Sequence, residues 1–368
     1  MTLAVGVPCY NAEKTLPNLL ASVKAQILPK DLEVVVILIS DGDDKEGRYY
    51  DIAVKYDIRF ITSSLKVNGG PGLARAEALS IAITNKYDLI TFIDADDVFS
   101  NVFAFMAFRN GFNAPDVVEV YTPFLQRNDN DMLVANTEPT SPWVFGKCFL
   151  VPFLKDNEIQ FTKLRAMEDS LFCNKVFHLA QARNLKVNIS QEPTYIWNPG
   201  SEHSITRMTV EGNPIPIYNY GLCQVGSYAA FKGLIEFLEK KAPFSPQIKV
   251  LACQMMITHY FTYYESLQNY DVFSPLNKDL ASLWYKEIYT KYCQGMPDET
   301  VEEIFMQSLA AKGMALKKFP SMTFKQFLED ISKIEPNVHQ RLEELPTDII
   351  EAFKKTGVLG SLDEEELW

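Results

Sequence analysis

The sequence predicts a doubly wound α/β domain with a mostly parallel sheet, followed by an α-helical C-terminal region. Two observations support this fold class. Over the first hundred residues, apolar stretches of strand length alternate with stretches of amphipathic helix, which is the pattern of a parallel sheet. From about Tyr218 onward, apolar residues recur at helical spacing. The length of 368 residues also exceeds that of one typical domain.

Four strands and three helices are expected in the first of these regions. Glu33–Ile39 is apolar on both faces, as is typical of a strand buried inside a parallel sheet. The expected strands are Leu3–Val7, Glu33–Ile39, Asp57–Ile61 and Asp88–Ile93. The expected helices are Ala12–Gln26, Lys45–Tyr56 and Gly72–Asn85, of which the first and third have apolar residues on one face.

The pattern is less regular after about residue 100, which suggests a boundary. Strands are expected at Asp116–Phe124 and Met132–Asn136, and a helix is expected to begin near Glu168. The amphipathic helices expected later are Ser227–Glu239, Gln247–Leu267, Lys278–Tyr292, Thr300–Leu316 and Thr323–Ile334. We therefore divide the chain into residues 1–100, 101–215 and 216–368.

Composition limits the classes of partner and the compartment. The net charge of −12 and the pI of about 5.0 argue against broad electrostatic binding to nucleic acid or to anionic lipid. No apolar run approaches the roughly 20 residues of a membrane span, and no signal peptide is expected. The six cysteines are scattered without a C-x-x-C pair, which favours free thiols in a reducing compartment. A cytoplasmic location is the resulting expectation.

Polar clusters directly follow three of the expected strands. They are Pro8–Asn11, Asp41–Asp44 and Asp94–Asp97. Because the carboxyl ends of parallel strands meet at one edge of a sheet, where ligands bind, we expect these clusters to lie together.

Asp94-Ala95-Asp96 is the strongest local signal at that edge. Carboxylates at alternate positions after a buried strand suit a hard divalent cation, Mn²⁺ or Mg²⁺, that shares its ligands with substrate phosphates. Strands also end in Asp simply because turns favour this residue. The second acidic turn expected at the same edge favours the metal site.

Three further segments have both a functional and a structural interpretation. Gly69–Arg75 could present amides and a cation to an anion, or it could be a simple turn into a helix. Glu168-Asp169 could supply a general base, or it could stabilise a helix N-terminus. The loop Trp197–Arg207 carries His203 and Arg207, which suit phosphate oxygens and a metal, although a single surface histidine often has no such role.

Taken in order, these segments resemble a family 2 glycosyltransferase of the GT-A fold over residues 1 to about 215. The matching motifs are Val5–Ala12, Ile39–Asp44, Gly69–Arg75, Asp94–Asp96 (its D-x-D motif), Trp143–Val151, Glu168-Asp169 and Ser204–Arg207. Ala76 departs from the asparagine that usually follows Ala-Arg in this family, and the region after about residue 216 matches no part of it.

The resemblance implies a role for each matching residue. Asp41 would bind the donor base and Asp94 the ribose, while Asp96 and His203 would hold the metal. Asp169 would be the general base, supported by Glu168. The residues implied in donor binding are Pro8, Tyr10, Asn11, Asp41, Gly70, Arg75, Asp94, Ala95 and Arg207.

The function implied is that of a metal-dependent, inverting hexosyl- or pentosyltransferase. It would move a sugar from a nucleotide-diphosphate donor, expected to be UDP-linked, onto an acceptor hydroxyl. Residues 1–100 would bind the nucleotide-sugar and residues 101–215 the acceptor, with residues 216–368 as a helical region through which a homo-oligomer could form. The acceptor stays open between a glycan, a small molecule, a protein and a modified nucleic-acid base.

Two alternatives remain. A nucleotidyltransferase-like enzyme would also use carboxylates and Mg²⁺, but its glycine-rich loop usually follows the first strand, where this chain has Pro8–Asn11. A non-catalytic binding module of the same fold would be expected to have lost the D-x-D or the Glu-Asp pair, and both are present.

Overall fold

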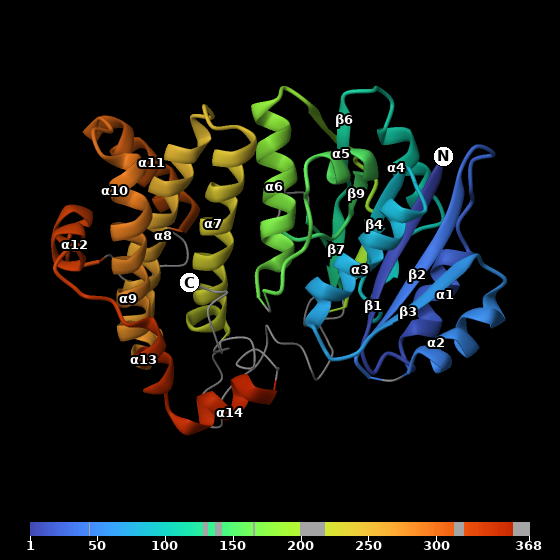
Figure 1. Cartoon of the computed structure of the whole chain (residues 1–368), viewed down its shortest axis with the longest axis horizontal. Helices are drawn as coiled ribbons and strands as arrows, with labels where there is room; N and C mark the ends of the chain where they lie inside the picture. Colours follow the sequence, from blue (N-terminus) through green and yellow to red (C-terminus); the bar gives the residue numbers. More distant parts are fainter. Residues whose placement is uncertain are drawn as a thin grey trace. The chain divides into compact units, whose positions relative to one another are not determined.

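The computed structural model describes residues 1–43, 45–127, 132–136, 142–164, 166–198, 218–312 and 320–355. The chain divides into two units, Met1–Ser204 and Ile205–Trp368. The first contains all the strands that the structure describes, and the regular elements described in the second are all helices (Figure 1). The predicted fold class, a mostly parallel α/β sheet with a helical C-terminal region, is confirmed.

A seven-stranded sheet forms the centre of the first unit, in the order β10-β6-β9-β4-β1-β2-β3. The strands β1, β2, β3 and β4 are parallel to one another, whereas β9 is antiparallel to both of its neighbours. Their bounds are β1 (Thr2–Cys9), β2 (Glu33–Asp41), β3 (Phe60–Leu65), β4 (Leu89–Phe92), β6 (Val117–Tyr121), β9 (Lys147–Leu150) and β10 (Lys186–Ile189).

The helices of this unit pack onto the sheet. Helix α3 contacts β1 and β2, and α6 contacts β6 and β10. At Gly6 in β1, a Cβ atom would lie 2.8 Å from the ring of Phe92 and 3.0 Å from Ala78 of α3, so close packing of α3 requires glycine there. The helices are α1 (Leu16–Lys24), α2 (Glu46–Ala53), α3 (Gly70–Thr84), α4 (Ala104–Gly111), α5 (Val151–Asp156) and α6 (Glu168–Ala182).

A second, four-stranded sheet has the order β5-β11-β7-β8. Strand β11 is parallel to β7 and antiparallel to β5. The bounds are β5 (Val98–Phe99), β7 (Phe124–Arg127), β8 (Leu133–Asn136) and β11 (Tyr195–Trp197). This sheet begins directly after the acidic turn Asp94–Asp97, and it brings Trp197 back to that turn.

Several element boundaries differ from the sequence prediction. The strand expected at Asp116–Phe124 is two strands, because Pro123 cannot donate a ladder hydrogen bond and the chain turns there. Strand β3 begins at Phe60 rather than Asp57, because Asp57 has a left-handed conformation (φ 47°) after a 3₁₀ turn. Strands β5, β9, β10 and β11 were not predicted.

The helical unit packs around α8, which contacts α7, α9 and α11 (Figure 1). Met255, Met256 and Tyr260 of α8 are buried, which confirms that this stripe is core. The helices are α7 (Leu222–Lys241), α8 (Gln247–Asn269), α9 (Ser274–Trp284), α10 (Thr290–Cys293), α11 (Asp298–Lys312), α12 (Phe324–Ile331), α13 (Val338–Glu343) and α14 (Thr347–Lys355). Within the part of the chain that the structure describes, none of the helices combines the length and apolar character that crossing a membrane requires.

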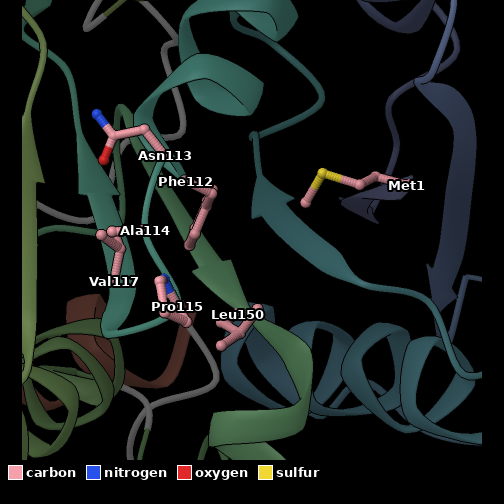
Figure 2. A pocket seen from close by; sticks show the side chains of 7 residues that line it. All are labelled: Met1, Phe112, Asn113, Ala114, Pro115, Val117 and Leu150. Carbon is pink, nitrogen blue, oxygen red and sulfur yellow. The ribbon is translucent and has the colours of Figure 1, made fainter.

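A cavity of about 340 Å³ lies at the amino-terminal edge of the large sheet. Figure 2 shows its lining, which comes from the start of β1, the segment before β6 and the end of the antiparallel β9. The lining residues are Met1, Phe112, Asn113, Ala114, Pro115, Val117 and Leu150. The polar clusters follow the opposite ends of the parallel strands, so this cavity is separate from them.

Candidate active site

The polar clusters meet at the carboxyl edge of the sheet, as predicted. Strand β1 pairs with β2 up to Cys9 and Ser40, and with β4 up to Gly6 and Phe92. The three segments that follow these strands therefore leave the sheet side by side.

Asp43 anchors the loop that follows β1. Its carboxylate accepts a 2.9 Å hydrogen bond from the backbone N–H of Asn11, which has a left-handed conformation (φ 52°). The hydroxyls of Ser40 and Tyr49 also donate to Asp43. Burial alone would raise the pKa of Asp43, but these hydrogen bonds lower it overall. The neighbouring ring of Tyr10 is exposed at the edge.

Asp41 joins the end of β2 to the start of α3. It is buried, and its two carboxylate oxygens accept hydrogen bonds of 2.7 Å and 2.9 Å from the N–H groups of Gly69 and Gly70. These are the amides that an anion site would use, so the geometry favours the structural interpretation of the glycine-rich turn. Contacts of Asp41 with a base and of Gly70 with a donor stay predictions.

Arg75 is a buried connector between two carboxylates. Its Nη2 donates to Asp94 at 2.6 Å and its Nη1 donates to Glu168 at 2.9 Å, and the side chain is only 4% exposed. Burial alone would lower the pKa of Arg75, but the charges of Asp94, Glu168 and Asp169 raise it. The arginine that the sequence suggested for an anionic ligand thus binds protein carboxylates.

Gly72 allows α6 to approach the first turn of α3. A Cβ atom at this position would lie 2.8 Å from Cγ of Glu168 and 2.8 Å from the carbonyl oxygen of Thr162. The glycine-rich segment is therefore required for the close packing that lets Arg75 reach Glu168.

Glu168 and Asp169 open helix α6, after Met167 in a left-handed conformation (φ 67°). Glu168 is buried, and burial together with the charge of Asp169 raises its pKa to about 7, although Arg75 opposes this shift. Burial also raises the pKa of Asp169, against the effect of Arg75. Asp169 is half-buried and accepts a 2.7 Å hydrogen bond from the N–H of Ser170, so it is the more exposed residue of the pair.

The carboxylates of the acidic turn Asp94–Asp97, which follows β4, bind different partners. Asp94 binds Arg75, whereas buried Asp97 accepts hydrogen bonds from the hydroxyl of Tyr195 and, at 2.7 Å, from the N–H of Asn198. Asp96 is exposed, but the surrounding protein and the charge of Asp94 raise its pKa to about 6. Asp96 is thus the carboxylate of this turn that is open to a ligand.

The oxygen ligands that the protein offers here fit a divalent cation whose other ligands come mainly from the substrate. Among the described residues, no group of three His, Cys, Asp or Glu side chains could hold a metal ion by itself. Mg²⁺ typically takes one or two carboxylates and completes its shell with phosphates and water, which suits Asp96. His203 and Arg207 lie outside the described residues.

Two side-chain interactions in this unit were not predicted from the sequence. Tyr195 joins the acidic turn, since its hydroxyl donates to Asp97 and lies 3.3 Å from the backbone nitrogen of Asp94. Lys147 and Glu119 form a buried ion pair at 3.4 Å between β9 and β6. The sequence signal for the second pair was a single glutamate inside the apolar run Val117–Tyr121.

Comparison with known proteins gives a family match and two relatives. The family described as Glycosyl transferase family 2 matches residues 4–104. The poly(ribitol-phosphate) beta-glucosyltransferase of Bacillus spizizenii is 26% identical over 218 residues, which are 55% of this chain and 33% of that protein. The poly(ribitol-phosphate) beta-N-acetylglucosaminyltransferase TarS of Staphylococcus aureus is 30% identical over 199 residues, 48% of this chain and 32% of that protein. The match thus spans about a third of the length of either relative.

Solved structures of TarS from S. aureus have a similar fold. One superposes with a TM-score of 0.58 at 18% identity, covering 86% of this chain and 53% of that chain. Another, of TarS 1–349 in complex with UDP-GlcNAc, gives a TM-score of 0.52 at 16% identity and covers 100% of this chain and 93% of that chain. The family match thus covers residues 4–104, and the parallel sheet with these structural likenesses shows that the N-terminal unit has the GT-A fold.

Proposed function

We propose that this chain is an inverting glycosyltransferase that moves a sugar from a UDP-linked donor onto an acceptor hydroxyl. The observation that carries the proposal is the bridge of Arg75 between Asp94 and Glu168. It brings a carboxylate of the donor edge next to the acidic pair that opens α6. Donor and acceptor groups can therefore meet at one point of the domain.

The donor would lie across the ends of β1, β2 and β4. The exposed ring of Tyr10 is available to stack on a base, and Pro8 and Asn11 flank it. The TarS structure in complex with UDP-GlcNAc supports UDP as the nucleotide. The two relatives are named for different sugars, glucose and N-acetylglucosamine, so the proposal does not choose between these.

Asp96 would hold a divalent cation, Mn²⁺ or Mg²⁺, together with the donor diphosphate. When bound, the cation offsets the negative charge that develops on the leaving diphosphate. The raised pKa of Asp96 supports this role, because a neighbouring cation removes the electrostatic cost of its charge.

Asp169 would act as the general base. It would take the proton of the acceptor hydroxyl while the hydroxyl oxygen forms a bond to the anomeric carbon. The bond from that carbon to the diphosphate oxygen breaks, its electron pair leaves with UDP, and attack from the opposite face inverts the configuration. The raised pKa of Asp169 supports this role, because a base is most effective when its pKa lies nearer to the working pH.

The remaining assignments follow from the same proposal. Residues 1–100 would bind the nucleotide-sugar, residues 101–215 the acceptor, and residues 216–368 would form a helical region. The relatives are named for poly(ribitol-phosphate), which supports a hydroxyl-rich acceptor. We also propose a cytoplasmic location, in keeping with the free cysteines of the described residues.

The test is binding and release of UDP from the purified chain. We expect UDP-glucose or UDP-GlcNAc to bind in calorimetry with Mn²⁺, to bind more weakly with EDTA, and to release UDP slowly. Asp96→Asn should lose the dependence on Mn²⁺, whereas Asp57→Asn, the same change at an exposed surface pair with Lys24, should behave like the wild type. Absence of nucleotide-sugar binding, or metal dependence retained in Asp96→Asn, would contradict the proposal.

A further inference from the structure

Tyr195 joins the two ends of the acidic turn Asp94–Asp97. Its hydroxyl donates to the carboxylate of Asp97 and accepts a 3.3 Å hydrogen bond from the backbone N–H of Asp94. The turn is also closed by a 3.0 Å hydrogen bond from the N–H of Asp97 to the carbonyl oxygen of Asp94. One phenol oxygen therefore contacts both the backbone and a side chain of this turn.

The ring of Tyr195 has a fixed position in the fold. Tyr195 is 1% exposed, and its ring stacks on Phe145, with centroids 4.9 Å apart and an interplanar angle of 27°. Strand β11, which carries Tyr195, pairs with β5 on one side and with β7 on the other. Because close packing and two neighbouring strands hold the ring, its hydroxyl reaches the turn from a defined direction.

Asn198 binds the same turn from three positions further along the chain. Its backbone N–H donates to Asp97 at 2.7 Å, and its side-chain amide donates to the carbonyl oxygen of Asp96 at 3.2 Å. The residues at the end of β11 therefore hold the backbone of Asp96 as well as the carboxylate beside it.

Asp97 needs these partners because it is buried. It is 1% exposed, and a buried carboxylate is stable only when hydrogen bonds replace the water that it has lost. Asp94 and Asp96 add like charges that oppose the compact form of the turn. The hydroxyl of Tyr195 and the N–H of Asn198 offset this repulsion. Without them we expect the turn to rearrange, and the exposed side chain of Asp96 to move with it.

We propose that Tyr195 and Asn198 are positioning residues that hold the backbone of Asp96 and thereby preorganise its carboxylate to bind a divalent cation. This inference rests on the proposed function, in which Asp96 holds the cation together with the donor diphosphate. Such a cation takes few ligands from the protein, so the direction of each one matters. Groups that orient a metal-binding side chain typically contribute about 10- to 100-fold to metal affinity.

A purely structural role of Tyr195 makes a different prediction. If its hydroxyl only stabilised the first unit, its removal would lower the melting temperature and would change UDP affinity equally with and without Mn²⁺. A positioning role changes the part of the affinity that depends on the cation. The part that does not depend on it should stay, because the contacts proposed for Tyr10 and Asp41 lie at the ends of β1 and β2.

The test is calorimetric titration with UDP at a series of Mn²⁺ concentrations and with EDTA. The midpoint is the Mn²⁺ concentration at which half of the gain in UDP affinity is reached. Tyr195→Phe keeps the ring and its stacking on Phe145 but removes the hydroxyl. Its midpoint should rise by about 10- to 100-fold, with the UDP affinity in EDTA unchanged. Free UDP binds Mn²⁺ equally in every experiment, so this reaction does not affect the comparison.

Two further variants complete the test. Asn198→Ala keeps its backbone N–H but removes the side-chain amide that donates to Asp96, and the midpoint should rise by about 5-fold, the effect of one lost hydrogen bond. Tyr121→Phe is the matched control, because it removes the hydroxyl of another buried tyrosine of this unit, which donates to the carbonyl oxygen of Asn136 at 3.1 Å. Its midpoint should stay at the wild-type value, although the lost hydrogen bond should lower its melting temperature.

Several outcomes would overturn the inference. These are an unchanged midpoint in Tyr195→Phe, a loss of UDP affinity that is equal with Mn²⁺ and with EDTA, and a midpoint that rises as much in Tyr121→Phe. If Tyr195→Phe does not fold, Asn198→Ala decides alone, and an unchanged midpoint there overturns the inference. Failure of the proposed function is a separate result, because the wild-type chain itself would then show no Mn²⁺-dependent binding of UDP, and the inference would fall with it.

Discussion

Arg75 and Glu168 lie 93 positions apart in the chain, and Nη1 of Arg75 donates a 2.9 Å hydrogen bond to the carboxylate of Glu168. The other arm of the same guanidinium holds Asp94 at 2.6 Å. Asp169 follows Glu168 directly at the start of α6. The position of the proposed base therefore depends on a side chain of α3, which also holds the donor-side carboxylate.

Arg75→Met should destabilise the first unit strongly. The methionine fills much of the space, but it leaves two carboxylates without their cation, and removing one partner of a buried pair costs about 3–5 kcal/mol. Arg75→Lys keeps the charge without the forked geometry and should lose less stability. Urea unfolding measures these differences. The control is Arg59→Met, which removes an exposed pair with Glu33 worth about 0–1 kcal/mol. An equal loss in both methionine variants would mean that the bridge contributes little.

Asp169→Asn should affect turnover alone. The asparagine oxygen can still accept the N–H of Ser170, so the free energy of unfolding should change by less than about 1 kcal/mol. Turnover should fall by roughly 10² to 10⁴, the usual contribution of a positioned base, with UDP-sugar affinity unchanged. Steady-state kinetics, calorimetry and melting temperature measure the three quantities. Near-normal turnover in Asp169→Asn, with a stability loss of about 1 kcal/mol in Asp169→Ala, would make Asp169 a helix-stabilising residue only.

Gly72→Ala should disturb the junction of α3 and α6. The added Cβ would lie 2.8 Å from the backbone oxygen of Thr162, which cannot rotate away, and overpacking of this kind costs about 1–3 kcal/mol. Gly47→Ala is the matched control, because it lies in α2 with no atom within 4 Å of the added Cβ. It should stabilise α2 by about 0.5–1 kcal/mol. Chemical denaturation of both variants checks the prediction, and a Gly72→Ala variant as stable as Gly47→Ala would refute it.

The helical unit should lose stability on acidification because of His259. This side chain is buried in α8 near Tyr228 and Trp284, and its Nε2 has no hydrogen-bond partner among the described residues. Burial lowers its pKa to about 3, below the ordinary histidine value of 6.5. Between these two values the unfolded chain binds a proton that the folded chain does not, so stability falls as the pH drops below 6.5.

The slope from this group approaches about 1.4 kcal/mol per pH unit only well below pH 6.5, so between pH 7.5 and pH 5.5 it should change the free energy of unfolding by about 1.4 kcal/mol in total. Unfolding of the helical unit, followed by its helical circular dichroism at pH 7.5 and pH 5.5, measures it. His259→Leu should remove this part of the slope, whereas His339→Gln, on the exposed surface of α13, should keep it. Identical slopes in the wild type and in His259→Leu would show that His259 does not bind the proton on unfolding.

The sequence predicts an element correctly where its local residue pattern matches the environment that the element has in the fold. Strand β2 is apolar from Val34 to Ile39 and lies between β1 and β3 in the sheet, and the acids that follow β2 and β4 lie at the shared edge because strand direction alone places them there. Strand β9 was missed because it has four residues and begins with Lys147. A lysine in so short a run looks like a surface position until Glu119 of β6 lies beside it.

The partners of site residues were harder to predict than their presence. The sequence suggested that Arg75 would meet an anionic ligand, because a cation after a glycine-rich turn is typical of such sites. Its carboxylate partners lie 19 and 93 positions away, and only the packing of α6 against α3 reveals the second. The same holds for Tyr195, which reaches Asp97 from 98 positions away. Long-range pairs of this kind leave no periodic signal in the chain.

The place of β9 between β4 and β6 has a consequence for biosynthesis (Figure 1). Strands β1 to β4 can pair as soon as Phe92 has left the ribosome, but β4 then forms an open edge, because its neighbour β9 ends only at Leu150. At about 5–20 residues per second, the intervening stretch of roughly 60 residues takes about 3–12 s to synthesise. During that interval the nascent sheet exposes an apolar strand with unpaired backbone groups, the kind of edge that templates aggregation. Chaperone binding to the nascent chain should therefore peak in this window, and a slow codon stretch between these two strands should lower the yield of folded protein.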